Sequence, residues 1–278
     1  MKSQSQPFVI NISQYKTSKN RKRQVICIFA RKKIVISFFK SKPKLSELIP
    51  DGYVDIHSHA LYGVDDGAQN IEDTAFLLQS MIDLKFSKCI TTPHTMKHVW
   101  DNTSESITGR LNDVKKALPE LTTQLKLQAA SEYLMDDSFT HLFKSTPLLT
   151  LKDKYVLVEM SYLNPPIQLH DIIFELQLAG YTPILAHPER YTFYHHDFEQ
   201  YHKLKKTGCL FQINLLSTVG YYGKPVADIA QKLLKNKMID FTGSDIHHKN
   251  HVNAFYKKIK IKEPEILVEA MTNNFLFQ

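Results

Sequence analysis

The segment Asp55-Ile56-His57-Ser58-His59 decides how the rest of this chain is interpreted. It follows a short apolar stretch and precedes the loop Val64-Asp65-Asp66-Gly67. A β-strand places residues i and i+2 on the same face, so two imidazoles at this spacing can bind one metal ion. A His-x-His pair alone is weak evidence in a chain with 13 histidines. Its place at a strand end, before a loop with two carboxylates, indicates a metal site.

Strand-like and helix-like segments alternate along the chain after this motif. The predicted strands are residues 53–56, 89–91, 125–130, 155–160, 182–186, 209–214 and 239–242. Helical periodicity occupies residues 71–84, 104–118, 137–143, 169–178, 198–206 and 226–234, and the C-terminal residues are mostly helical. Such alternation predicts an α/β fold with parallel strands and right-handed crossovers. At 278 residues the chain has the size of a single α/β barrel.

Six of the predicted strands lead into side chains that can bind metals. The carboxyl ends of the strands in an α/β barrel meet at one face, where such folds carry their chemistry. We predict these metal ligands at that face: His57, His59, Asp66, His94, Glu132, Glu159, His187, Asp245 and His247. One strand-end His or Glu is more often structural than a ligand, but six coincident strand ends favour a shared site.

So many ligands exceed what one ion can use. Two or three divalent ions that share bridging carboxylates would use them all. Mixed histidine and carboxylate ligation suits manganese, iron or zinc better than calcium. The pattern is typical of a metal-dependent hydrolase, in which two neighbouring ions lower the pKa of a shared water.

These motifs together resemble the polymerase-and-histidinol-phosphatase (PHP) superfamily. The resemblance covers roughly residues 45–278 and rests on Asp-Ile-His-Ser-His, Asp-Asp-Gly, Thr-Pro-His, Glu132, Glu159, Ala-His-Pro-Glu-Arg-Tyr and Ser-Asp-Ile-His. Within the superfamily, the order and spacing are similar to those of the bacterial tyrosine-protein phosphatases of capsular and exopolysaccharide operons.

The resemblance implies a distorted (β/α)7 barrel of the PHP type and a trinuclear, typically manganese-dependent site with two or three ions. It implies that the ligands named above hold these ions and that Arg190 binds the substrate phosphate. Arg190, Asp66 and His247 are the expected catalytic residues. The implied substrate is phosphotyrosine in the tail of a bacterial tyrosine kinase of polysaccharide export.

The chain departs from the family pattern after Ser-Asp-Ile-His. Family members often have a further arginine there, whereas this chain has His248-Lys249-Asn250-His251. We expect Lys249, or one of these histidines, to contact substrate in its place, although a lysine lacks the bidentate fork of an arginine.

The basic charge of the chain lies in an N-terminal extension. Residues 1–46 hold 12 of the 35 Lys and Arg and no acid, which leaves 23 bases against 28 acids and a net charge of −5 in the rest. We therefore predict residues 1–44 as a basic, disordered extension outside the fold and residues 45–278 as the phosphatase domain. A peripheral contact of the extension with anionic lipid or a membrane-bound partner is the alternative. The acidic body argues against a nucleic-acid partner.

The cysteines and the apolar segments bear on compartment and mechanism. Cys27, Cys89 and Cys209 form no CxxC pair, which favours reduced thiols and a cytoplasmic location. A cysteine-based phosphatase needs an arginine six positions after its cysteine, and none of the three has one. We expect no membrane span, because no segment reaches about 18–20 apolar residues. Residues 25–39 are interrupted by three basic residues, so we expect no signal peptide.

Two other function classes stay open. One is another PHP-type phosphoesterase, acting on a small phosphomonoester such as histidinol phosphate. The other is a non-enzymatic module of the capsule-export machinery, which the complete ligand set argues against.

Several residues near the motifs receive supporting roles. We expect Asp55 to hold a ligand imidazole in its tautomer, Asp65 to shape its loop, Glu189 to lie just outside the ligands, and Tyr191 and Trp100 to line the entrance. The remaining histidines are expected at the surface or outside the ligands (His98, His195, His196, His248, His251) or as structural residues in helices (His141, His170, His202).

Overall fold

A computed structural model describes residues 42–278, so the predictions for residues 1–41, Cys27 included, lie outside the described part. Within residues 42–278 the strands pair in parallel. They are β1 (Tyr53–Asp55), β2 (Phe86–Thr91), β3 (His94–Thr95), β4 (Gln128–Ala129), β5 (Glu132–Leu134), β6 (Tyr155–Glu159), β7 (Thr182–Ala186), β8 (Leu210–Asn214) and β9 (Phe241–Gly243). One sheet has the order β1-β2-β4, and the other has the order β3-β5-β6-β7-β8-β9.

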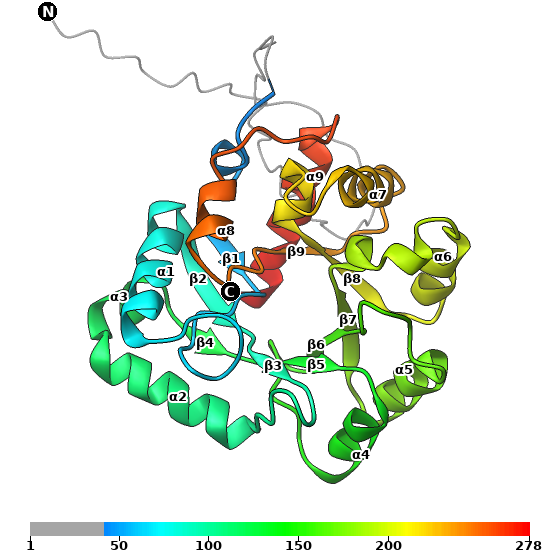
Figure 1. Ribbon diagram of the computed structural model, residues 1–278, viewed down its shortest axis with the longest axis horizontal. Coiled ribbons are helices and arrows are strands. Elements are labelled where there is room, and N and C mark those ends of the chain that lie inside the picture. Colours follow the sequence, from blue (N-terminus) through cyan, green and yellow to red (C-terminus); the bar gives the residue numbers. More distant parts are fainter. Residues whose placement is uncertain (1–41) are drawn as a thin grey trace, which may run out of the picture. The chain divides into compact units, whose positions relative to one another are not determined.

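The helices lie mainly around the outside of these strands (Figure 1). They are α1 (Ile71–Asp83), α2 (Ser104–Ala117), α3 (Pro119–Gln124), α4 (Asp137–Ser145), α5 (Leu169–Leu178), α6 (Glu199–Lys206), α7 (Lys224–Lys235), α8 (Lys249–Ala254) and α9 (Pro264–Asn273). The predicted α/β class with parallel strands is therefore confirmed.

One predicted strand begins later than expected, and two short strands were not predicted. The prediction of a strand over residues 125–130 is wrong at its start, because Leu125 ends α3 and Lys126 has a φ of 47°. The short strands β3 and β5 were not predicted. Each follows a two-residue break after β2 or β4, too short to leave a periodic pattern.

Hydrogen bonds between the strands do not close a barrel within residues 42–278. Between the ends of β1 and β9 the structure has an isolated parallel bridge, Ser58 with Ile246, in place of a strand ladder. There the backbone N–H of His59 donates to the carbonyl of Ile246 at 2.9 Å. Residues 42–278 thus form two parallel sheets, and helices cover the outside of both.

The strands bury both of their faces, as parallel strands under helices do. In β6, Leu157 packs in one apolar cluster with Ile184 of β7, while Val156 and Val158 pack in another with residues of α4 and α5. Glu159 follows Leu157 by two residues and so points to the same inner side. Alternation along the strand thus carries a carboxylate to the carboxyl end of the interior.

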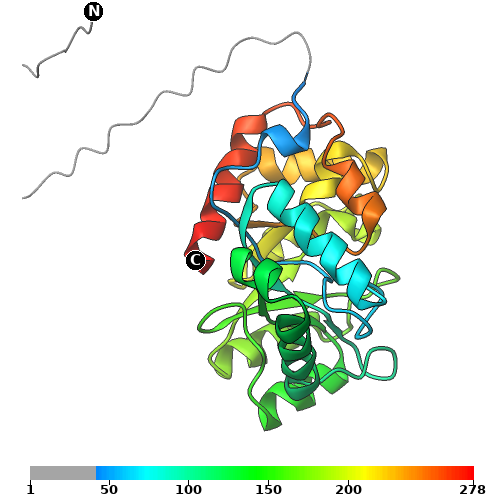
Figure 2. The ribbon, with the colours of Figure 1, turned by 90° about the vertical axis from the view of Figure 1, so that its left-hand side faces the viewer.

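The first described residues pack against the segment between α8 and α9. Lys44 pairs with Lys258 in an antiparallel bridge, and the N–H of Ile259 donates to the carbonyl of Pro43 at 3.0 Å. Figure 2 shows this contact at the start of the blue segment, beside the orange-red connection.

Candidate metal centre

Every residue predicted as a metal ligand lies at the carboxyl ends of the strands or in the adjoining loops. The structure brings these residues into overlapping groups whose ligand atoms lie within 4.8 Å of one another. The groups are His59, Asp66, His94 and His247; His57, Glu132 and His187; His57, His59 and Asp245; and His94, Glu132 and Glu159. We call this set the nine-residue cluster.

Glu132 lies at the centre of the cluster. Its Oε2 is 3.1 Å from His57 Nε2, 3.2 Å from His94 Nδ1 and 3.5 Å from His59 Nε2. Its Oε1 is 3.1 Å from His187 Nε2. One fully buried carboxylate therefore faces imidazoles from three strand ends on two sheets, which is the geometry of a bridging ligand.

Asp245 faces the cluster with one oxygen and the outside with the other. Its Oδ1 lies 3.3 Å from His57 Nε2 and 3.4 Å from His59 Nε2. Its Oδ2 accepts hydrogen bonds from Asn214 Nδ2 at 2.7 Å and from Arg190 Nη1 at 2.8 Å. This division leaves Oδ1 free to bind a cation.

The open side of the cluster is formed by Asp66, His94 and His247. Asp66 Oδ1 lies 3.4 Å from His247 Nε2 and 3.6 Å from His94 Nε2, and its side chain is 56% exposed. The other carboxylates are buried. The cluster is therefore most exposed to solvent on the side of Asp66.

Hydrogen bonds from outside the cluster fix the imidazole tautomers. His59 Nδ1 donates to Asp65 Oδ2 at 2.7 Å, and His57 Nδ1 donates to Gln212 Oε1 at 2.7 Å. The Gln212 amide donates in turn to the carbonyl of Ile213, which identifies its Oε1 as the acceptor. Each ring therefore turns Nε2 toward the cluster, where a metal ion would take the place of a proton.

The role predicted for Asp55 is wrong. Its carboxylate accepts from the N–H of Ser244 at 2.8 Å and from Ser244 Oγ at 2.7 Å, so it ties β1 to the end of β9. Asp65 and Gln212 hold the imidazoles instead. The prediction that Asp65 shapes its loop is confirmed by its acceptance of the Gly67 N–H at 2.9 Å. Gln212 was missed because an amide within a strand gives no motif.

Buried polar atoms in the cluster lack partners and so test whether metal ions fit. Among the described residues, His59 Nε2, His94 Nδ1 and Glu159 Oε1 make no hydrogen bond. His94 Nδ1 and Glu159 Oε1 are nevertheless only 2.7 Å apart, without hydrogen-bonding geometry. Buried polar groups are almost always satisfied, so convergent unpartnered ligand atoms fit a cation between them.

The pKa shifts of the cluster histidines also indicate a site for cations. Burial alone would lower the pKa of His94, but the carboxylates of Glu159 and Glu132 outweigh burial and raise this pKa to about 9. Burial, reinforced by Arg190, lowers the pKa of His187 to about 4. Carboxylates likewise outweigh burial at His57 and His59 and raise both pKa values. Four carboxylates thus converge on these imidazoles. Cations that displace the imidazole proton offset this negative charge.

The backbone is strained at two cluster residues. His187 has a φ of 36° and Asp245 a φ of 51°, values that non-glycine residues rarely adopt. In β7, Ile184 and Ala186 face the interior. Strict alternation would therefore turn His187 outward, and the left-handed conformation redirects it to Glu132. Such strain costs about 1–3 kcal/mol and is concentrated at functional sites.

Arg190 lies beside the cluster between two tyrosine rings. Its guanidinium carbon is 4.2 Å from the ring centroid of Tyr222 and 4.7 Å from that of Tyr162. Only Nη1 is engaged by Asp245, and the side chain is 20% exposed. The arginine is thus held by cation–π contacts while part of its fork faces outward.

Lys249 does not join this arrangement. It is exposed at the start of α8, and no hydrogen bond or ion pair within residues 42–278 connects it to the cluster. His251 lies closer: it is 7% exposed, and its Nδ1 is 3.0 Å from the carbonyl oxygen of Asp245. Arg190 is the cation in direct contact with the cluster.

The prediction of which aromatic residues line the entrance to the cluster also needs correction. Tyr191 is fully buried, and its hydroxyl accepts from the N–H of Met160 at 2.9 Å, so its predicted place at the entrance is wrong. Tyr162 is the exposed aromatic residue, with its hydroxyl 3.3 Å from His187 Nε2. Trp100 lies in the loop after β3, where it pairs with Met96.

Glu189 lies outside the cluster, as predicted. It is fully buried, and its Oε1 accepts from the N–H of Asn214 at 2.9 Å and from Ser217 Oγ at 2.7 Å. Burial raises its pKa to about 7. By fixing Asn214, it supports the hydrogen bond from Asn214 to Asp245. Three other histidines fall in helices as predicted: His141, His170 and His202.

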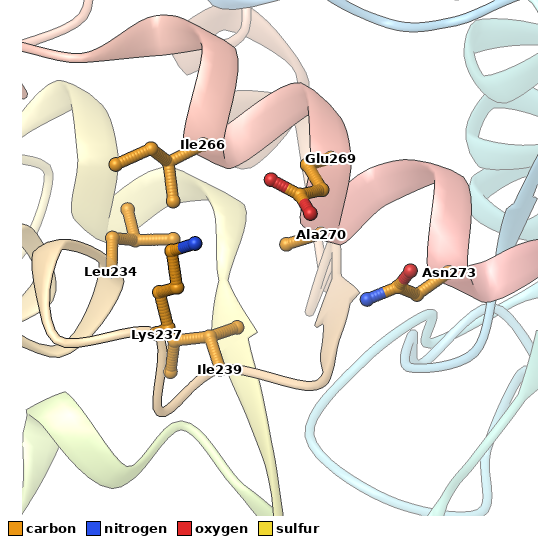
Figure 3. A pocket seen from close by; sticks show the side chains of 7 residues that line it. All are labelled: Leu234, Lys237, Ile239, Ile266, Glu269, Ala270 and Asn273. Atoms are coloured by element: carbon orange, nitrogen blue, oxygen red, sulfur yellow. The ribbon is translucent and has the colours of Figure 1, made fainter.

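Other features of the described chain contribute nothing to the cluster. A cavity of about 160 Å³ between α7 and α9, lined by Leu234, Lys237 and Glu269 among others, contains none of its residues (Figure 3). Cys89 and Cys209 are buried, and burial raises the pKa of Cys209 to about 12. Among the described helices, none combines the length and apolarity that a membrane span requires.

Comparison with protein families gives a match over most of the described chain. The model of the family described as "Capsular polysaccharide synthesis, CpsB/CapC" matches residues 53–262. The putative tyrosine-protein phosphatase CapC of Staphylococcus aureus is 28% identical over 195 residues, which cover 70% of this chain and 76% of the relative. The tyrosine-protein phosphatase YwqE of Bacillus subtilis (strain 168) is 28% identical over 196 residues, which cover 70% and 77%.

A solved structure agrees with this match. It belongs to a study of YwqE from Bacillus subtilis and CpsB from Streptococcus pneumoniae, described as unique metal-dependent tyrosine phosphatases. The chain aligns with it at a TM-score of 0.70 and 25% identity, over 81% of this chain and 95% of the other.

Proposed function

Because the chain belongs to the capsular polysaccharide synthesis CpsB/CapC family, we propose that it is a metal-dependent protein-tyrosine phosphatase, a phosphoric monoester hydrolase. The observation that carries this proposal is the convergence of the nine-residue cluster beside Arg190. The names of the relatives and the likeness to a metal-dependent tyrosine phosphatase support it. The two parallel sheets are then the two parts of a distorted (β/α)7 barrel, and residues 45–278 are the phosphatase domain.

The cluster would hold two or three divalent ions, with Mn²⁺ as the proposed metal and iron or zinc as chemically suitable substitutes. Its five imidazoles and four carboxylates would hold these ions, with Glu132 at the centre of the set. When bound, the ions supply hydroxide at neutral pH and positive charge near the phosphoryl oxygens.

The chain's own residues position the substrate. Arg190 binds phosphoryl oxygens through the nitrogens that Asp245 leaves free, and it offsets the charge that develops on them in the transition state. Tyr162 and Tyr222 limit its motion, so little rotamer freedom is lost on binding. Asp66 and His247, on the open side of the cluster, lie where the phosphate enters and act as catalytic ligands. Lys249, exposed at the start of α8 two residues after His247, is the proposed second substrate contact.

The physiological substrate in this proposal is phosphotyrosine in the tail of a tyrosine kinase that regulates polysaccharide export. The description of the family supports this choice, since it refers to capsular polysaccharide synthesis. Tyrosine phosphate is also a favourable substrate chemically, because the phenolate is a good leaving group.

The substrate class can be tested directly. We expect the full chain in Mn²⁺ to hydrolyse a phosphotyrosine peptide with a much higher kcat/KM than histidinol phosphate, because the peptide contacts more of the entrance. Release of inorganic phosphate measures both reactions in one preparation. A preference for histidinol phosphate would contradict the proposal and favour a small-molecule phosphoesterase.

Thiol chemistry provides a second test. Alkylation of the native enzyme should leave kcat/KM unchanged, because Cys89 and Cys209 are buried and neither lies in the nine-residue cluster. The measurement is phosphatase activity after iodoacetamide treatment, with mass spectrometry to count modified cysteines. Complete inactivation by modification of either residue, with the circular dichroism spectrum unchanged, would contradict the metal mechanism.

A further inference from the structure

We propose that a groove beside the nine-residue cluster binds the residues that flank phosphotyrosine in the protein substrate, and that it selects an apolar flanking side chain. This inference rests on the proposed function and deepens it. The groove lies between the β5–α4 loop (residues 134–137) and the β6–α5 loop (residues 161–168), and its volume is about 370 Å³. Binding sites for organic ligands begin at roughly 300 Å³.

The groove is continuous with the cluster through the backbone. Leu134, on one wall, pairs in register with Glu159, and the N–H of Met135 donates to the carbonyl of Glu159 at 2.8 Å. The other wall begins at Ser161, two residues after Glu159. A peptide whose phosphate occupies the cluster therefore passes this groove within a few residues, since an extended chain advances about 3.3 Å per residue.

Tyr162 connects the groove to the phosphate-binding arginine. It follows Ser161, contacts Arg190 with its ring face, and stacks on His187 with ring centroids 5.7 Å apart. The side chain is 44% exposed. One face of its ring is thus turned toward the site while the rest remains accessible at the start of the groove.

The chemistry of the groove defines its occupant. Leu134, Pro166 and Ile167 supply apolar surface, and the side chain of Ile167 is fully exposed. Leu163, in the same loop, is 86% exposed. Exposed apolar residues are ordinary when scattered, but a group of them beside a catalytic site marks a binding surface.

The charge of the groove excludes acidic occupants. Asp136 and Asp137 line it, and no Lys or Arg does among the described residues. Asp136 is engaged as the N-cap of α4, whereas Asp137 is exposed. The expected occupant is an extended segment with an apolar side chain near the phosphotyrosine and without an acidic residue beside it.

The walls are held in place independently of substrate. α4 and α5, which follow the two loops, lie side by side (Figure 1), and their residues Phe139, Phe143 and Ile172 are buried in the same apolar cluster. A preformed groove loses little entropy on binding, so apolar contacts inside it contribute to affinity.

The test compares Ile167→Asp with Phe174→Asp in the full chain with Mn²⁺. Phe174 is also apolar and exposed, at 59%, but it lies on α5 outside the groove. The substrates are free phosphotyrosine, a phosphotyrosine peptide flanked by leucine, and the same peptide flanked by glutamate. In Ile167→Asp we expect kcat/KM for the leucine peptide to fall about tenfold through a higher KM. A change of this size corresponds to the loss of one buried apolar side-chain contact. Its kcat/KM for free phosphotyrosine should not change, and Phe174→Asp should match the unmodified chain on all three substrates.

A reciprocal variant tests the charge. Asp137→Asn should raise kcat/KM for the glutamate peptide and leave free phosphotyrosine unaffected. The groove proposal would be overturned if Ile167→Asp and Phe174→Asp had equal kcat/KM on the leucine peptide. It would also be overturned if Ile167→Asp lost as much kcat/KM on free phosphotyrosine as on the leucine peptide. Failure of the unmodified chain to hydrolyse any phosphotyrosine substrate would overturn the proposed function itself, which is a separate result.

Discussion

Glu132→Ala is expected to abolish both metal binding and phosphatase activity. Its two oxygens face His57, His94 and His187, so one substitution removes the ligand shared between the proposed ions. The three carboxylates that remain, Asp66, Glu159 and Asp245, balance less of the charge of two or three cations. We expect metal content, measured by mass spectrometry, to fall by at least one ion per chain, and kcat/KM on a phosphotyrosine peptide to fall to background. Glu120→Ala, which removes an exposed carboxylate from α3, should change neither.

Chelation provides the same test without a substitution. Removal of metal from the unmodified chain should eliminate activity, and added Mn²⁺ should restore it. Glu132 is buried, so Glu132→Ala could lower activity by disturbing the fold as well as by removing a ligand. Chelation removes the metal without any substitution and therefore separates the two effects. Full activity in excess chelator, with no bound metal found, would exclude the metal mechanism.

Arg190→Ala is the second variant with a large expected effect. Loss of one preorganised donor to a transition state typically costs about 2.7–4 kcal/mol, which corresponds to a decrease of about 10²–10³-fold in kcat/KM. Metal content should stay near that of the unmodified chain. A guanidinium is not a ligand, and Asn214 still holds the Oδ2 of Asp245 at 2.7 Å. The measurement is kcat/KM on a phosphotyrosine peptide together with metal content of the same sample.

Arg190→Lys refines this test. A lysine keeps the charge but cannot form two parallel hydrogen bonds to phosphate or stack between the rings of Tyr162 and Tyr222. We therefore expect it to recover little activity. Normal kcat/KM in Arg190→Ala, or a loss explained entirely by missing metal, would contradict the role of Arg190 in phosphate binding.

The predicted ligands could be named from the sequence because their positions follow from local rules. Short apolar runs mark the strands, and alternation with helices makes the strands parallel, so their carboxyl ends share one face. His57, Glu159 and Asp245 each follow an apolar strand and therefore had to lie near that face. The residues that support them could not be found in this way. Gln212 and Asn214 belong to β8 and carry no motif, and Tyr222 lies in a loop that no pattern connects to Arg190.

The entrance illustrates the same limit. Tyr191 was predicted there because it adjoins Arg190 in the chain, yet its ring is buried and its hydroxyl is used by Met160. Tyr162 is the aromatic residue at the entrance, and it is held there by contacts with His187 and Arg190. These two residues lie 25 and 28 positions later in the chain. Exposure of an aromatic ring depends on which neighbours cover it, and sequence adjacency does not report this.

By itself, the sequence determined the α/β class, the parallel strands and the set of metal-ligand candidates, because each of these depends on periodicity or on position at a strand end. Only the tertiary structure decided that Glu132 is the central carboxylate and that Asp65 and Gln212 orient the imidazoles. These outcomes depend on distances between residues that are far apart in the chain: His57 and Gln212, 2.7 Å apart, are separated by 155 positions. Such pairings arise from packing of the whole sheet, and no local pattern encodes them.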